Sequence, residues 1–249
     1  MSGHSKWSSI KHKKGAADAK RGKLFTKLAR AITVAAREGG GSPENNATLG
    51  TAIQKAKDQS MPKDNIQRAI DRGTGEGSDG TTIERIVYEG YGPGGTALLV
   101  DALSDNRNRT GSEIRHAFDR HGGSLGEPNS VSWQFEKRGV ILLDGKRYDE
   151  DDLIVAIDAG AEDVDGDGDM VRVLTAPSDL TAVRTALEDS GMEIESADVV
   201  MDPTTTVEVE EGDAKTLLKL MDALEDHDDV EAVFANFDIS DEVMERALA

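Results

Sequence analysis

The sequence contains no cysteine, few aromatic residues and no long apolar segment. Its 249 residues include 6 prolines and 2 tryptophans, and only 4% of them are aromatic. Without cysteine, disulfides and thiolate metal sites are excluded. The apolar runs at 97–100 and 140–143 are far shorter than the ~20 residues of a membrane-spanning helix. No apolar segment follows the basic N-terminus as it would in a secretory signal. We therefore expect a cytoplasmic protein without membrane contacts.

Positive charge is scarce overall and concentrated at one end of the chain. There are 29 basic and 48 acidic residues, a net charge of −19. Residues 1–80 carry 15 basic and 8 acidic residues, and the first 37 carry ten and one. Because each Lys or Arg that neutralises a phosphate releases counterions and adds affinity, this segment indicates nucleic-acid binding. The alternative is an ordinary solvated charged surface.

Many basic residues of the first segment are expected on one face of a helix. Between Asp18 and Arg37, apolar residues recur at helical spacing and leave lysines and arginines on the opposite face. The residues before this helix read as a basic arm that contains Trp7. The candidate nucleic-acid-binding residues are Lys6, Trp7, Lys11, His12, Lys13, Lys14, Lys20, Arg21, Lys23, Lys27 and Arg30.

Two further amphipathic helices complete the first predicted domain, residues 1–78. Ser42 is the expected N-cap of the second helix, with Pro43 at its first position, and Pro62 is expected to open the third. Gly73 is the expected stop of the third helix, and the glycine-rich stretch 73–80 reads as a linker.

The rest of the chain alternates strands and helices. Strands are expected at 86–89, 96–103 and 131–136, and a helix is expected from Thr110, whose spacing to Glu113 fits a capping box. Residues 137–204 read as a βαββαβ unit, and a last βαβ segment follows it. That last segment has no sheet of its own and would complete the middle one.

The predicted fold is therefore α+β with three domains. A three-helix bundle (1–78) precedes two α/β sandwich domains of ferredoxin-like type. The middle one is discontinuous (79–136 with 205–241), and the acidic third domain covers 137–204.

The sequence contains partial matches to motifs for catalysis, cofactor binding and metal binding, but their predicted structural surroundings do not suit these functions. The G-x-G-x-x-G segments at 75–80 and 90–95 lead into strands rather than helices, and the G-x-S-x-G segment at 122–126 follows a helix. The acidic stretch at 163–168 has Leu174 where a calcium loop needs glutamate. The five histidines lack ligand spacing. We expect no enzymatic activity, cofactor, metal or small-molecule substrate.

The turn Asp105–Thr110 contains Arg107 and Arg109 at an expected helix N-terminus. This pattern is typical of a polar turn that caps a helix, and it also fits a second phosphate contact through the two arginines. The sequence leaves both interpretations open.

Several motifs together resemble one family from end to end and in the right order. They are Gly3-His-Ser-Lys-Trp7, Lys11-His-Lys13, Asp18-Ala-Lys-Arg-Gly-Lys23, Met61-Pro-Lys-Asp64, Tyr88-Glu-Gly-Tyr-Gly-Pro-Gly94, Asp105-Asn-Arg-Asn-Arg-Thr110, His121-Gly-Gly123, Ser130-Val-Ser-Trp133 and Asn236-Phe-Asp238. The chain resembles the YebC/PmpR family, whose eukaryotic relatives include the mitochondrial translational activator of cytochrome c oxidase. The resemblance implies a non-enzymatic three-domain cytoplasmic protein.

The resemblance implies two functions between which the residues discriminate only in part. Members are described as DNA-binding transcriptional regulators, which is the first expectation. The alternative description is a ribosome-associated factor that relieves stalling at proline runs and contacts ribosomal RNA or tRNA. The basic face of the first helix carries mostly lysine and no Asn or Gln, which suits phosphate contact better than base reading. An arm with Trp7 and His12 suits folded RNA.

Overall fold

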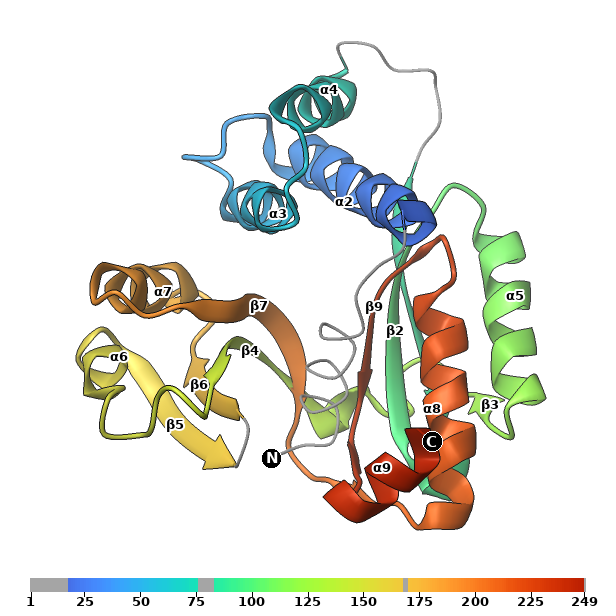
Figure 1. Ribbon diagram of the computed structural model, residues 1–249. Helices are drawn as coiled ribbons and strands as arrows, with labels where there is room; N and C mark the ends of the chain where they lie inside the picture. Colours follow the sequence, from blue (N-terminus) through green and yellow to red (C-terminus); the bar gives the residue numbers. More distant parts are fainter. Residues whose placement is uncertain (1–17, 76–82, 168–169, 249) are drawn as a thin grey trace.

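The protein consists of one helical unit and two sheet units (Figure 1). The computed structural model describes residues 18–75, 83–167 and 170–248. The helical unit lies at the top of the view, a central sheet carries helices on its right-hand side, and a second sheet lies at the left. This confirms the predicted α+β class, with an N-terminal helical bundle followed by two α/β domains.

The helical unit contains α2 (Asp18–Gly39), α3 (Ala47–Asp58) and α4 (Lys63–Thr74). Their apolar faces meet in one core, as the helical spacing of the sequence predicts. The fully or almost fully buried members include Leu28, Ile32, Leu49, Ala56 and Ala69. The described part of the chain has no helix that is both long and apolar enough to cross a bilayer.

The ends of α3 and α4 differ from the predictions. The N-cap of α3 is Asn46 rather than Ser42; its side chain accepts the N–H of Leu49 at 3.1 Å and donates to Ala35 O at 2.8 Å. Asn46 therefore ties the start of α3 to the end of α2. Gly73 lies inside α4, and the helix ends one residue later, with Gly75 in the left-handed conformation at φ 93°.

The central sheet joins segments that lie far apart in the sequence. Its strand order is β3 (Ser124–Leu125), β1 (Glu84–Tyr91), β2 (Ala97–Ser104) and β9 (Val230–Ala235), all antiparallel neighbours. Helices α5 (Arg107–Arg120) and α8 (Glu211–Glu225) cover one face (Figure 1). Helix α9 (Asp241–Leu248) packs against α8. Because β9 pairs with β2, the central unit is discontinuous, as expected.

The strand predicted at 131–136 is wrong over its first four residues. Residues 132–134 form a turn of 3-10 helix, and β4 (Phe135–Asp144) begins after it. The buried carboxylate of Glu89 accepts the backbone N–H groups of Asn129, Val131 and Ser132 at 2.7–2.9 Å. These bonds hold the segment in a turn, so it cannot extend into a strand. β4 then runs unbroken across position 136, and the exact domain limits stay a prediction.

The third unit has the predicted βαββαβ order. Its sheet runs β5 (Ala161–Asp167), β6 (Met170–Thr175), β4 and β7 (Ile194–Pro203), and α6 (Ile154–Asp158) and α7 (Leu180–Asp189) complete the unit. The acidic stretch from position 163 therefore belongs largely to a strand. A separate parallel pair joins β8 (Val207–Glu208) and β10 (Phe237–Asp238).

The helical unit contacts both sheet units. Lys55 of α3 pairs with Asp198 of β7 at 3.1 Å, and Arg184 of α7 pairs with Asp58 at 3.0 Å. Helix α2 contacts the central unit through the polar residues described next.

Candidate nucleic-acid interface

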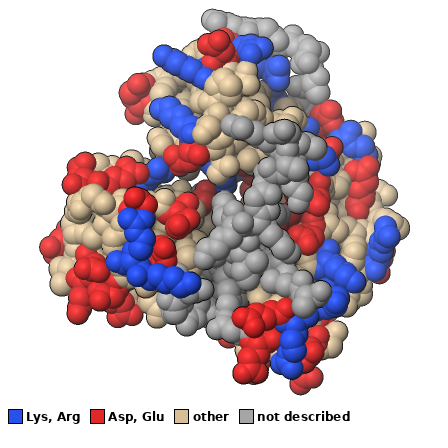
Figure 2. Space-filling model, in the orientation of Figure 1, with Lys and Arg blue, Asp and Glu red and all other residues tan. Residues whose placement is uncertain are grey.

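The helical unit is the basic part of an acidic protein. Residues 22–75 carry nine Lys or Arg and five Asp or Glu, against a net charge of −19 for the whole chain. Figure 2 shows Lys and Arg side chains with some Asp and Glu over the helical unit at the top of the view, and on the sheet units below it shows clusters of Asp and Glu with Lys and Arg between them. The charge asymmetry of the sequence is therefore also an asymmetry in space.

The predicted binding residues fall into two groups. Lys6, Trp7, Lys11, His12, Lys13 and Lys14 lie outside the described residues, as do the side chains of Lys20 and Arg21. Nucleic-acid binding by these residues stays a prediction. The described candidates are Lys23, Lys27 and Arg30 of α2, together with Arg107 and Arg109 at the start of α5.

The three cations of α2 reach toward the central unit. Lys23 is exposed and lies 3.3 Å from Asp228, whereas the Lys27 ammonium donates to Glu225 O at 2.6 Å. Arg30 donates to Leu103 O at 3.0 Å and to the Asp229 carboxylate at 2.7 Å. This side of α2 therefore joins two units of the protein, and binding of nucleic acid by it stays a prediction.

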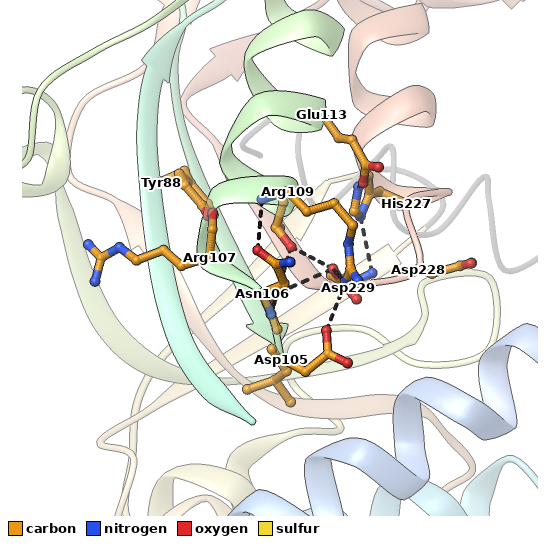
Figure 3. A network of polar contacts seen from close by, with 12 residues as sticks. Tyr88, Asp105, Asn106, Arg107, Arg109, Glu113, His227, Asp228 and Asp229 are labelled. Atoms are coloured by element: carbon orange, nitrogen blue, oxygen red, sulfur yellow. Dashed lines mark hydrogen bonds and ion pairs between the residues drawn. The ribbon is translucent and has the colours of Figure 1, made fainter. Parts of the chain in front are cut away.

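Asp229 is the centre of this contact (Figure 3). Its side chain is only 5% exposed and accepts hydrogen bonds from Arg30 at 2.7 Å, Arg109 at 2.7 Å and Thr110 at 2.6 Å. Burial alone would raise the pKa of Asp229, but the bonds from Thr110, Arg109 and Arg30 outweigh it and lower the pKa to about 2. The carboxylate is therefore ionised and links α2, α5 and the turn before β9.

The turn Asp105–Thr110 has a different cap from the expected one. Asn106 caps α5 by accepting the N–H of Arg109 at 3.1 Å, while the buried hydroxyl of Thr110 bonds Asp229 instead. Arg109 also pairs with Asp105 at 3.0 Å. The exposed side chain of Arg107 extends away from this network (Figure 3). The structure therefore separates the two arginines: Arg109, although 44% exposed, is held by Asp105 and Asp229, and Arg107 extends into solvent.

His227 supports the same turn. The backbone N–H of Asp229 donates to His227 Nδ1 at 3.1 Å, so the proton of the neutral ring lies on Nε2. Nε2 in turn lies 2.8 Å from the Glu113 carboxylate.

Sequence reasoning did not single out Asp229 or His227. Both are single polar residues in an acidic segment, and their partners lie more than a hundred positions away in the chain. The Asp-Asn-Arg-Asn-Arg-Thr motif was the only signal in the sequence, because it supplies Arg109 and Thr110. Within residues 18–75, 83–167 and 170–248, no group of three or more His, Asp or Glu could hold a metal ion.

The fold and this cluster define a class: a three-unit α+β protein whose basic helical unit is fastened to an acidic body. Residues 5–76 match the family model described as "TACO1/YebC protein N-terminal domain", and residues 83–237 match "TACO1/YebC second and third domain". The chain belongs to the TACO1/YebC family.

Relatives with similar sequences carry one name. A "Probable transcriptional regulatory protein" of Rubrobacter xylanophilus is 59% identical over 245 residues, which cover 98% of both chains. One of Geobacter sp. strain M21 is 55% identical over all of both chains. The crystal structure of a conserved hypothetical protein from Aquifex aeolicus, 47% identical, superposes with a TM-score of 0.82 over 91% of this chain and 94% of that one. These names support a regulatory role for the family.

Proposed function

We propose that this chain is a non-enzymatic, nucleic-acid-binding regulator of gene expression that acts in the cytoplasm and binds through its basic N-terminal segment. The observation that carries the proposal is the net charge of +9 in residues 1–37 of a protein with net −19. The acidic body repels phosphates over a distance limited by screening to about 8–10 Å, so the basic end acts independently. The names of the relatives fit a regulator of transcription that binds DNA.

A second candidate is a translation factor that binds ribosomal RNA or tRNA and relieves stalling at proline runs. One observation favours it. A recognition helix needs a free face to enter the major groove, yet Lys27 and Arg30 of α2 contact the central unit. A basic segment that follows irregular RNA needs no such helix.

Charge reversal in the arm tests the shared part of both candidates. We expect Lys13→Glu/Lys14→Glu to weaken binding of labelled DNA and RNA. The slope of log affinity against log salt should also fall by about 0.7–0.9 for each phosphate that the variant no longer neutralises. The matched control is Lys215→Glu/Lys219→Glu, which reverses two exposed charges on α8. Equal slopes for both variants would mean that the binding surface lies elsewhere in the protein.

Sedimentation of cell lysate separates the two candidates. If residues 6–23 are required for cosedimentation with ribosomes at physiological salt, the translation role holds. If deleting them changes nothing in that assay, and the protein instead protects one promoter with a preference of about 10³ or more over other DNA, the transcription role holds.

A further inference from the structure

A groove of about 510 Å³ lies between the helical unit and the start of the central unit. One wall is α2, the other is α4, and Ile83 and Asp105 close the end toward the central sheet. Its volume is within the range of about 300–1,000 Å³ typical of ligand-binding pockets. The groove is much larger than a single ion needs.

The charged residues of the groove are four arginines and one aspartate. Arg30 and Arg37 lie two turns apart on α2, and Arg68 and Arg72 lie one turn apart on α4, so each helix presents a pair along one face. The single acid, Asp105, pairs with Arg109 outside the groove at 3.0 Å. Arg30 is already paired with Asp229 at 2.7 Å, so the positive charge of the groove comes mainly from the other three arginines, in a protein with a net charge of −19.

The cations are all arginines, and one of them is pre-oriented. Asn65 accepts a hydrogen bond from Arg68 Nη2 at 2.6 Å, and Asp64 O accepts one from Nε at 3.2 Å. A guanidinium forms paired hydrogen bonds with phosphate oxygens and stacks on flat rings, whereas an ammonium acts as a point charge. The groove therefore suits a ligand with both a phosphate and a planar ring.

The floor of the groove is apolar. The half-buried Phe25 and Ala29 of α2 line it, and beneath them lie Met61 and Ala69, which are only 6% and 2% exposed. An acidic peptide would satisfy the arginines but would leave this floor unused. A nucleotide would use both, because its base can lie against aromatic and apolar side chains while its phosphate meets the arginines.

We propose that the groove between α2 and α4 binds unpaired nucleotides of single-stranded nucleic acid, with phosphates at Arg68 and Arg72 and a base against Phe25. The proposal rests on the proposed function and names the form of nucleic acid that this unit selects. A base inside a duplex is stacked on both faces and cannot enter a groove of this volume. Binding therefore discriminates single-stranded from double-stranded partners.

The test uses the full chain and a matched pair of double variants. Arg68→Gln/Arg72→Gln removes two exposed charges from α4, and the control Arg115→Gln/Arg120→Gln removes two exposed charges from α5. Glutamine keeps helix propensity in both cases. Anisotropy measures binding of a labelled single-stranded oligouridylate and of an RNA hairpin stem with the same number of phosphates.

We expect the groove variant to bind the single strand about tenfold or more weakly, while the control variant and binding of the stem change little. A 5-iodouridine oligomer should cross-link to the tryptic peptide 24–27, which contains Phe25, and the groove variant should lose this cross-link.

Other outcomes overturn the inference in distinguishable ways. If both double variants bind alike and peptide 24–27 is not labelled, the groove is not the site, although arm-dependent binding leaves the proposed function intact. If the unmodified protein binds neither of these RNAs and no labelled DNA, the proposed function fails as well. If polyglutamate binds with the same dependence on Arg68 and Arg72 but does not displace the labelled single strand, the groove is a site for acidic peptides.

Discussion

Asp229 carries the contact between the basic helix and the acidic body. Two arginines from different units share its carboxylate, and Thr110 supplies a third donor. A carboxylate that is 5% exposed is stable in ionised form only when such donors replace its water. The ionised state of Asp229 and the attachment of α2 therefore depend on each other.

We expect Asp229→Asn to destabilise the protein by about 2 kcal/mol, because the amide loses the charge that the two arginines stabilise. The matched control is Asp228→Asn. Its exposed carboxylate pairs only at the surface with Lys23, at 3.3 Å, so a change of at most about 1 kcal/mol is expected. Urea unfolding near neutral pH measures both variants, and equal losses would contradict the role of Asp229.

The same residue sets an acid dependence. Its pKa is lowered from 3.8 to about 2 on folding, so its contribution is complete above pH ~4 and is lost as the pH falls toward 2. In unfolding experiments across this window, the difference in stability between the parent and Asp229→Asn should shrink toward zero. A difference that stays constant with pH would assign the effect to packing alone.

Polar residues at turns are where the sequence was least informative. Asn46 and Asn106 are the helix caps, although Ser42 and Thr110 also fit the usual patterns. Cap choice is decided by tertiary partners: Asn46 bonds the end of α2, and Asp229 draws the hydroxyl of Thr110 away from the helix end. Those partners cannot be read from local spacing, because the second lies 119 positions away.

At the scale of elements, α2 packs against three neighbours. Its apolar face meets α3 and α4, and its basic face meets the turn before β9. The apolar spacing predicted the first contact correctly. The contact of the basic face could not be predicted from this spacing, since a run of lysines and arginines is typical of both a solvated surface and an interface between units.

Gly73 permits the close approach of α4 to α2. A Cβ at this position would lie 2.4 Å from Thr33 O and 2.7 Å from the Ala36 side chain. We expect Gly73→Ala to destabilise the helical unit by about 1–3 kcal/mol through this overpacking, despite the higher helix propensity of alanine. Thermal unfolding monitored by circular dichroism measures the change.

Gly50→Ala is the internal control for this prediction. Gly50 is also helical, in α3, but its added Cβ would meet only Pro43 O at 3.6 Å, an ordinary contact. The substitution should therefore be neutral or stabilise the unit by up to about 1 kcal/mol. If the two glycine variants had the same melting temperature, the close packing of α4 on α2 would not restrict the size of the side chain at position 73.

At the scale of the whole molecule, the third unit is an insertion within the central one. The chain leaves the central unit along β4 and returns along β7, and these strands pair from Phe135↔Pro203 onward. The buried core of the third unit draws its members from positions 141–187. The core beneath α8 combines Leu98, Val100 and Phe118 with residues from 209 onward. The alternation of strands and helices allowed this order to be predicted, whereas the lengths of β4 and β7 required the structure.

Two deletions should therefore have opposite effects. In one variant, residues 139–199 are replaced by Asn-Gly, which closes a two-residue hairpin between the paired residues Arg138 and Val200. This variant keeps Val200 and Met201, which pack on the far face of the central sheet. Its described contacts to the helical unit include the ion pair Lys55–Asp198 at 3.1 Å, which the deletion removes, and a pair at this exposure contributes about 0–1 kcal/mol. We expect it to unfold cooperatively in urea.

In the other variant, the chain ends at residue 204 and lacks β9 and α8. β2 then loses one of its two neighbouring strands, and the fully buried Leu98, Ile114 and Phe118 lose the helix that covers them, although none of these three residues is altered. Exposure of one such side chain costs about 1.5–3 kcal/mol, so the loss from all three is comparable to the whole stability of a single domain, about 5–15 kcal/mol. We expect hydrogen exchange to show no protected amides in β1 and β2 and no cooperative transition from residues 83–135. A cooperative transition in this variant, with none in the hairpin variant, would mean that the central unit does not need the C-terminal segment that its sheet contains.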